Sequence, residues 1–268
     1  MRIFWQSFVD EATSAPYMKK LARDLNEIAA PGTKVEVFGL TPPDRAFSRL
    51  SELRCAILAI DNAIAAAEAG YDAVVMGHFQ DPGLYEMKSA VDIPVIGAGE
   101  VTMHFAAQLG RQIGLVSLDD LYRSHHMEQT AQYGLSDRVV HVAGMNGQPS
   151  DFSAAFAGDA AARARMLDTF RSVAQPMVDK GADVIVAAGI LPAMLVGSEF
   201  GMKIGPAPVV NSAAVTLFSA EMQVRLARLN GTRICRGQHC NLAPDQAISD
   251  FRELVAKGRQ STLSLKSE

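Results

Sequence analysis

The stretch from Asp72 to Leu84, DAVVMGHFQDPGL, places a histidine at the end of an apolar run. Such a run predicts a buried strand, and Gly77 and His78 follow where that strand should end. Open α/β sheets keep their ligands beside the carboxyl ends of their strands. Histidine titrates closest to neutral pH, so it can serve as an acid, a base or a hydrogen-bond donor. His78 is therefore our candidate catalytic residue.

Other polar residues nearby have a structural interpretation. Asp81 and Pro82 have the order of a helix start, in which Asp81 caps the free amides and Pro82 takes the first helical position. Glu100, in the first turn of a later predicted helix, suits the positive end of the helix dipole. His125 and His126 are neighbours on a predicted helix and point in different directions, which is typical of a solvated surface.

The segment CRGQHC, from Cys235 to Cys240, packs two thiols and an imidazole into six residues. Its spacing is not that of a zinc site, and no further set of ligands lies nearby in the sequence, so we predict neither zinc nor a local disulfide there. In the first strand, Phe4 is expected in the core. Trp5 suits either the core or the wall of a ligand cleft.

Strands and helices alternate along the chain, which predicts parallel sheets with right-handed crossovers and helices on both faces. The predicted strands are 2–6, 34–40, 73–78, 94–97, 112–117, 138–143, 183–189 and 207–211. The main predicted helices are 50–69, 98–109, 118–133, 158–180 and 212–229.

The chain also repeats itself. EAGYDAVVMGHFQDPGL matches DKGADVIVAAGILPAML at a constant offset of 111 residues, which pairs Asp72 with Asp183 and His78 with Gly189. IPVIGAGEVTMHFA then matches APVVNSAAVTLFSA, and a weaker match pairs Ser7 with Ser117. A duplication of this kind predicts two copies of one α/β unit.

Two such units are expected to face each other across a cleft. Their helix N-termini carry free amides and a positive dipole end, so an anion such as a carboxylate is the natural ligand. We expect the last helices to return to the first unit. The predicted halves are therefore 1–97 plus 212–268, and 98–211.

Composition limits the possible partners. The 268 residues are 49% hydrophobic and 20% charged, with a formal net charge of −4, and they include no basic block typical of nucleic-acid or membrane-surface binding. The first residues, MRIFWQSF, turn polar too early for a signal peptide, and no apolar run reaches transmembrane length. Three cysteines make no disulfide framework, so we expect a cytoplasmic location.

With GYDAVVMGHFQDPGL, VDIPVIGAGEVTMHFA, ADVIVAAG and PVVNSAAVTLF, the chain resembles the aspartate/glutamate/hydantoin racemase superfamily, nearest to its hydantoin and allantoin racemase branch. The resemblance extends from MRIF to about residue 230. It implies an enzyme without a cofactor, in which two cysteines flank the substrate Cα. One thiolate removes the proton and the other thiol delivers a proton on the far face.

The sequence departs from that pattern at the decisive positions. The first family cysteine falls on His78 and the second on Gly189, whereas Cys55, Cys235 and Cys240 match neither position. Two-cysteine racemisation is therefore not expected. Histidine on one side and glycine on the other favour reactions that need a proton donor or acceptor on one face, and the space beside the glycine suits a bulky ring.

The resemblance also places the substrate-binding segments. The turn that binds the substrate carboxylate falls on Gln6, Ser7 and Phe8, and its repeat falls on Ser117 and Leu118; the two serines are also suitable caps of strand ends. The turns after the two central strands contribute Phe79, Gln80, Gly189, Ile190 and Leu191, and Asn211 and Ser212 stand where relatives often have Asp-Pro.

Together these observations predict two pseudo-symmetric, flavodoxin-like, three-layer α/β halves with parallel sheets and the active site in the cleft between them. We expect a homo-oligomeric enzyme that needs no cofactor or metal and acts on a small carboxylate or cyclic amide through His78, as an isomerase, lyase, decarboxylase or hydrolase. Two alternatives stay open: a non-catalytic member that binds a metabolite, and a racemase with a second base other than cysteine.

Overall fold

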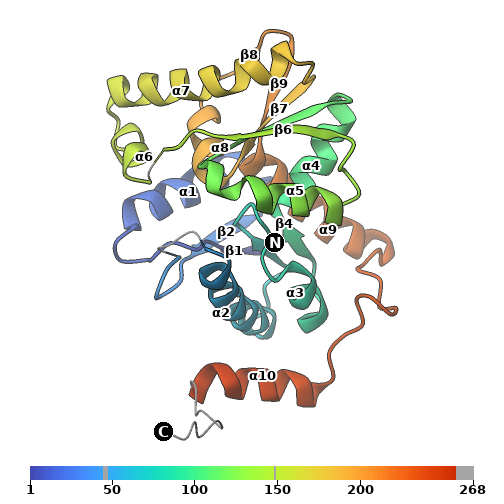
Figure 1. Ribbon diagram of the computed structural model, residues 1–268. Coiled ribbons are helices and arrows are strands. Elements are labelled where there is room, and N and C mark those ends of the chain that lie inside the picture. Colours follow the sequence, from blue (N-terminus) through green and yellow to red (C-terminus); the bar gives the residue numbers. More distant parts are fainter. Residues whose placement is uncertain (45–47, 148, 258–268) are drawn as a thin grey trace, which may run out of the picture.

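The computed structural model describes residues 1–44, 48–147 and 149–257, so part of the predicted first half, 258–268, lies outside the described residues. The first sheet has the strand order β2-β1-β3-β4, and its pairs are parallel (Figure 1). Its elements are β1 (Arg2–Gln6), α1 (Ala15–Ile28), β2 (Lys34–Phe38), α2 (Arg49–Glu68), β3 (Ala73–Met76), α3 (Leu84–Ala90) and β4 (Val95–Gly97).

The second sheet repeats this arrangement with the order β6-β5-β7-β9-β8. All eight predicted strands are present; the added strand β8 pairs antiparallel with β9. The elements are α4 (Ala98–Leu109), β5 (Ile113–Ser117), the 3₁₀ turn η1 (Asp120–Tyr122), α5 (Arg123–Gln132), β6 (Val139–Gly144), α6 (Pro149–Phe156), α7 (Ala160–Asp179), β7 (Val184–Ala188), α8 (Ile190–Val196), β8 (Lys203–Ile204), β9 (Ala207–Asn211), α9 (Ser212–Asn230) and α10 (Asp245–Lys257).

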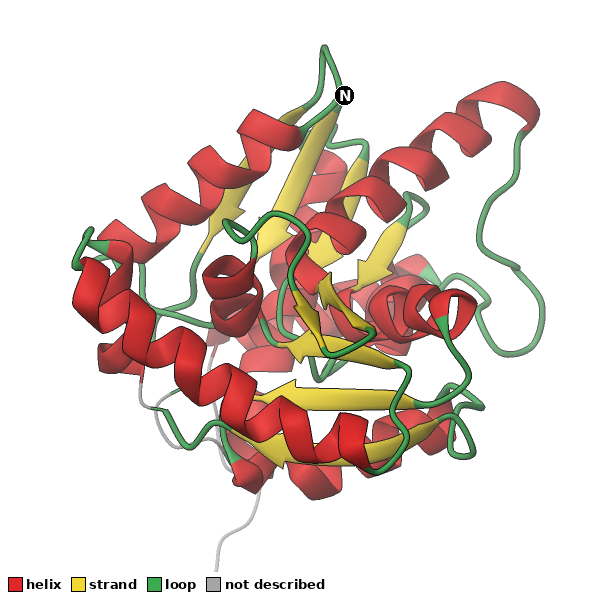
Figure 2. Cartoon of the chain, turned by 90° about the horizontal axis from the view of Figure 1, so that it is seen from above, coloured by secondary structure: helices red, strands yellow, loops and turns green. Residues whose placement is uncertain are grey.

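The period of two along each strand divides the core between the two faces of a sheet. In the first sheet, Ile3, Trp5 and Val75 pack in one cluster with residues of α1 and α9, whereas Phe4 and Met76 pack in another with residues of α2 and α3. Trp5 is fully buried and so belongs to the core. Both faces of the sheets are covered by helices (Figure 2), which confirms the predicted three-layer α/β fold.

The duplication is visible in a hydrogen bond that fastens two neighbouring strands to each other in each half. Oδ2 of Asp72 accepts a hydrogen bond from the backbone amide of Arg2, at 2.7 Å. Oδ2 of its repeat partner Asp183 accepts from the amides of Arg111 and Gln112, each at 3.0 Å. In both copies, the carboxylate that precedes the central strand binds the start of the neighbouring strand.

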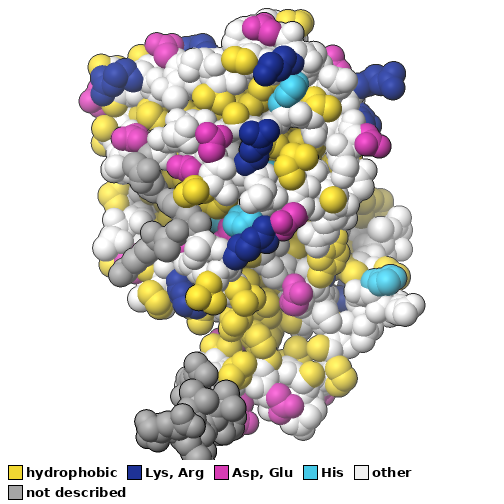
Figure 3. Space-filling model, viewed as in Figure 1, with side chains coloured by type: hydrophobic (Ala, Val, Ile, Leu, Met, Phe, Trp, Pro, Cys, Tyr) yellow, Lys and Arg dark blue, Asp and Glu magenta, His cyan; other side chains and the backbone are white. Residues whose placement is uncertain are grey.

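The last part of the chain crosses back over the first sheet. Helix α9 packs against β3, β4, α1 and α4, and it also contacts β7 and β9. An extended segment then leads to α10, which lies against α2 at the edge of the molecule (Figure 1). Figure 3 shows hydrophobic side chains gathered between the body of the molecule and α10. No helix within the described residues is long and apolar enough to cross a membrane.

Candidate active site

The exits of β1, β3, β5 and β7 meet at one cavity, which both halves of the molecule line. Its volume is about 130 Å³. Segments 7–9 and 77–80 form one side, together with Tyr17 and Asp44. Leu118, Tyr122 and segment 188–192 form the other side. Parallel strands place their carboxyl ends at the same edge of a sheet, which is why residues from distant parts of the sequence converge here.

Most of the residues that we predicted from the sequence surround this cavity. The structure brings together His78, Ser7, Phe8, Phe79, Gln80, Leu118, Gly189, Ile190 and Leu191. It does not bring Gln6 or Ser117 to the cavity wall.

The side chains of Gln6 and Ser117 are buried and have other partners. Nε2 of Gln6 donates to the carbonyls of Ser7, Phe38 and Gly39 at 2.9, 3.2 and 3.1 Å, so it holds the β1–β2 edge. Oγ of Ser117 lies 3.0 Å from Nε2 of His126. Both residues act in the framework behind the cavity, and their prediction as substrate-binding residues finds no support in this geometry.

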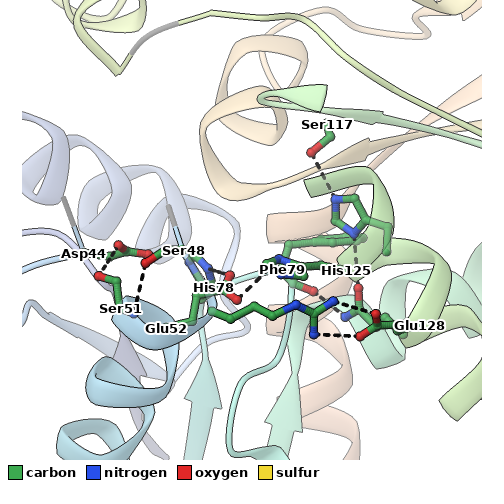
Figure 4. A network of polar contacts seen from close by, with 12 residues as sticks. Asp44, Ser48, Ser51, Glu52, His78, Phe79, Ser117, His125 and Glu128 are labelled. Carbon is green, nitrogen blue, oxygen red and sulfur yellow. Dashed lines mark hydrogen bonds and ion pairs between the residues drawn. The ribbon is translucent and has the colours of Figure 1, made fainter. Parts of the chain in front are cut away.

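His78 is held between an aromatic ring and a carboxylate. Its ring stacks on Phe8 with centroids 4.6 Å apart and an interplanar angle of 12°. Its Nε2 lies 3.3 Å from Oε1 of Glu52 (Figure 4). An ionised carboxylate can only accept hydrogen bonds, so Nε2 carries the proton and Nδ1 is the basic nitrogen of the neutral ring.

Glu52, on α2, was missed in the sequence analysis. Its side chain is 9% exposed, and its second oxygen, Oε2, lies 3.4 Å from Nδ1 of His125 on α5. Burial alone would raise the pKa of Glu52, but the hydrogen bond with His78 and the positive charge that His78 and His125 carry when protonated outweigh it and lower the pKa. A buried carboxylate thus joins imidazoles from the two halves.

The prediction of a solvated surface at His125 and His126 is wrong. The side chain of His125 is 12% exposed and faces Glu52, and His126 is fully buried against Ser117 and Gln129. The two rings do point in different directions, but the ring of His125 faces Glu52 on α2 and the ring of His126 faces Ser117 on β5. Burial lowers the pKa of His126 to about 4, which keeps that ring neutral.

Asp81 caps a different helix from the one predicted. Helix α3 begins at Leu84, and Asp81 has a left-handed backbone with φ 51°. Its carboxylate instead accepts from the amides of Gly99 and Glu100 at the start of α4, at 3.1 and 2.7 Å. The interpretation of Asp81 as a cap is correct, but its position in the fold is not the one expected.

The capping carboxylate belongs to a buried network behind the cavity. Tyr133 donates to Oδ2 of Asp81 at 2.7 Å. Gln129 donates to the same oxygen at 3.3 Å and to the carbonyl of Phe79 at 2.6 Å. This network fixes the backbone of the segment that follows His78. Burial raises the pKa of Asp81 to about 7, although the hydrogen bonds from Tyr133 and the α4 amides act in the opposite direction.

Apart from Tyr122, the opposite wall of the cavity is apolar. Segment 188–192 consists of alanine, glycine, isoleucine, leucine and proline, so it contributes no ionisable side chain. Gly189 has a φ of +147°, a conformation that favours glycine. None of the three cysteines, which all lie within the described residues, lines the cavity. Cys55 is buried on α2, and burial raises its pKa to about 11.

Known proteins with related sequences and folds match this chain. A sequence model of the Asp/Glu/hydantoin racemase family matches residues 8–195. The chain is 32% identical over 71 residues to the hydantoin racemase of Paenarthrobacter aurescens, a match that spans 26% of this chain and only 30% of that protein.

Solved structures extend the likeness to the whole fold. The allantoin racemase of Klebsiella pneumoniae superposes with a TM-score of 0.73 at 19% identity, over 91% of this chain and 94% of that one. A liganded arylmalonate decarboxylase mutant superposes with a TM-score of 0.53 at 14% identity, over 87% and 95% of the two chains. At these identities the superpositions establish a shared fold. The family match covers more than half of the sequence, and the chain belongs to the Asp/Glu/hydantoin racemase family.

Proposed function

We propose that this protein is a cofactor-independent enzyme that transfers protons to or from a small carboxylate or cyclic amide, with His78 as the acid/base. The proposal rests on one observation: His78, which lines the cavity, contacts the buried carboxylate of Glu52. The carboxylate orients the ring, fixes its tautomer and stabilises the imidazolium that forms after proton uptake. This is the role of the carboxylate in other acid/base pairs.

Neutral hydroxyl groups are suited to hold the anionic or carbonyl part of the substrate. The backbone amide of Ser7 already donates to the carbonyl of Phe38 at 2.7 Å. Ser7 can therefore offer its side-chain hydroxyl to a substrate. That hydroxyl is hydrogen-bonded to Tyr17, whose pKa burial raises to about 12. Tyr17 therefore stays a neutral donor at physiological pH. We propose that Ser7 and Tyr17 bind the substrate together.

The apolar wall favours chemistry on one face of the substrate. A group bound between His78 and segment 188–192 meets a titratable side chain on one side and hydrocarbon on the other. Isomerisation, elimination, decarboxylation and hydrolysis need no proton from the far face. Stereoinversion does need one. The fold shared with an arylmalonate decarboxylase variant is compatible with this reaction class.

For the alternative of a racemase with a second base, the candidate for that base is Tyr122. Tyr122 lines the cavity from the second half, and the centroid of its ring is 6.4 Å from that of His78. Burial raises the pKa of Tyr122 above its usual value, so deprotonating it is costly. For this reason we favour one-sided chemistry. A non-catalytic metabolite-binding protein is the remaining alternative.

The test is a reaction screen in heavy water with hydantoins, allantoin and arylmalonates, followed by NMR, polarimetry and mass spectrometry. We expect a product of changed structure or mass from the wild type, a loss of at least about 100-fold in rate for His78→Ala, and a smaller loss for Glu52→Gln. His239→Asn, at an exposed histidine, is the matched control. Deuterium at Cα with loss of optical activity would instead support racemisation. Binding without turnover would support the metabolite-binding alternative.

A further inference from the structure

Two side-chain pairs link α2 of the first half to α5 of the second half. Helix α2 carries Arg49 and Glu52, and α5 carries His125 and Glu128. In each helix the two residues are three positions apart, so they lie on one face. The guanidinium of Arg49 donates to both oxygens of Glu128, at 2.9 and 2.5 Å. Nδ1 of His125 lies 3.4 Å from Oε2 of Glu52 (Figure 4).

The carboxylate of Glu52 is shared by two imidazoles. Oε1 lies 3.3 Å from Nε2 of His78, and Oε2 is the oxygen that faces His125. An ionised carboxylate only accepts hydrogen bonds, so the neutral rings carry their protons on different nitrogens, Nε2 in His78 and Nδ1 in His125. We propose that His125 is a positioning residue for His78, because it holds the carboxylate of Glu52 in the orientation that supports the His78 ring.

Glu52 needs a second partner to keep that orientation. Its side chain is only 9% exposed, and an oxygen of Asp44 lies within 4.8 Å of it. Burial and a neighbouring acid both disfavour an ionised carboxylate, which therefore requires donors on both oxygens. Rotation about the last side-chain bond of a glutamate has broad preferences, so one contact does not fix the carboxylate. A donor on Oε2 keeps Oε1 directed at His78.

The donor on His125 is buried and unsatisfied. Among the described residues its Nδ1 has no hydrogen-bond partner, because its approach to Glu52 lacks the geometry of a hydrogen bond. An unpaired buried N–H group is costly. Hydrogen bonds between catalytic groups are often long or misaligned without substrate and tighten in the complex. A small movement of α5 toward α2 completes the bond, and the pair of Arg49 and Glu128 holds the two helices near each other.

His125 acts through Glu52 and not on the substrate. It is not among the described residues that line the cavity, whereas His78 is. The expected effect of His125 on catalysis is therefore on kcat and not on KM. This effect on turnover rests on the proposed function. The orientation of Glu52 and the proton positions on the two rings do not depend on it.

The first experiment is ¹⁵N NMR of the histidine rings at about pH 8, where histidines are ordinarily neutral. The signals are assigned by their loss in His78→Ala and in His125→Leu. In the wild type we expect Nε2–H in His78 and Nδ1–H in His125. His125→Leu should shift the ring signals of His78. The same substitution should cause no further shift in Glu52→Leu, because substitutions that act through one shared partner are not additive.

Two variants of similar size separate the hydrogen bond from packing. His125→Asn places an amide N–H group close to the position of Nδ1, whereas His125→Leu fills similar space without a donor. His125→Leu should lower kcat by about 10-fold with KM unchanged. His125→Asn should recover most of this loss. The folding of both variants is checked by circular dichroism.

Three results overturn the positioning role. The first is a neutral His125 ring that carries its proton on Nε2. The second is a set of His78 ring signals that His125→Leu leaves unchanged. The third is an equal loss of kcat in His125→Leu and His125→Asn, since packing alone would then account for it. If the expected proton positions and the shift are found and no substrate turns over, the positioning role stands and the proposed acid/base function fails.

Discussion

Replacing Asp81 with asparagine tests whether burial or hydrogen bonding determines the protonation state of Asp81 in the network behind the cavity. The pKa of this buried carboxyl is raised from 3.8 to about 7, so the folded state keeps a proton that the unfolded state releases. Its contribution to stability is fully present below about pH 3.8 and is lost as the pH rises to about 7. At 1.36 kcal/mol per unit, the shift corresponds to ~4 kcal/mol. The side-chain amide of asparagine cannot ionise, so Asp81→Asn lacks this dependence.

The assay is urea unfolding of the wild type and of Asp81→Asn between about pH 4 and 8, compared as the difference in free energy of unfolding at each pH. We expect the wild type to lose ~4 kcal/mol relative to the variant across this range. Asp137→Asn, at an exposed position, should show no such trend. A difference that stays constant would mean that Asp81 is ionised throughout and that the hydrogen bonds from Tyr133 and the α4 amides outweigh burial.

Three further substitutions probe the framework, each measured by urea unfolding against the wild type. Gly77→Ala should destabilise the fold by about 3 kcal/mol, because the new Cβ would lie 2.1 Å from Nε1 of Trp5. A free energy of unfolding equal to that of the wild type would show that β1 shifts readily. Ser117→Ala should cost about 1–3 kcal/mol, because it leaves Nε2 of buried His126 without its partner; Ser117→Thr, which keeps the hydroxyl, is the control. Asp183→Ala should cost about 1 kcal/mol by removing the acceptor of two backbone amides, and no change would contradict the fastening role of the repeated aspartate.

Much of the fold was predictable because its signals are local. Apolar runs predicted all eight main strands, and the offset of 111 residues indicated two α/β halves. The start of α3 was not predictable in this way. Asp81 has the local sequence of a cap, but its left-handed backbone turns the carboxylate to amides 18 and 19 residues further along the chain. Tertiary contacts of this kind leave no trace in the neighbouring residues.

The candidate site was predictable at the strand exits and not on the helices. A strand exit has a fixed place in an open sheet, so His78 and Gly189 could be assigned to one cavity from their order alone. Glu52 and His125 lie on helices whose rotation and mutual approach depend on the packing of both halves. Glu52 also stands among charged neighbours in the sequence, which is the usual pattern of a solvated helix face.

The repeat and the cavity together suggest how an asymmetric site can arise on a symmetric scaffold. Both halves keep the strand order and the fastening aspartate, so the framework is common to the two copies. The copies differ in the turn that follows the central strand. His78 and Asp81 correspond to Gly189 and Pro192, so one exit carries an imidazole and a buried carboxyl while the other carries neither. The proposed proton chemistry on one face of a substrate therefore depends on differences between two short turns, together with Glu52 on α2, and the strands of both sheets can stay as they are.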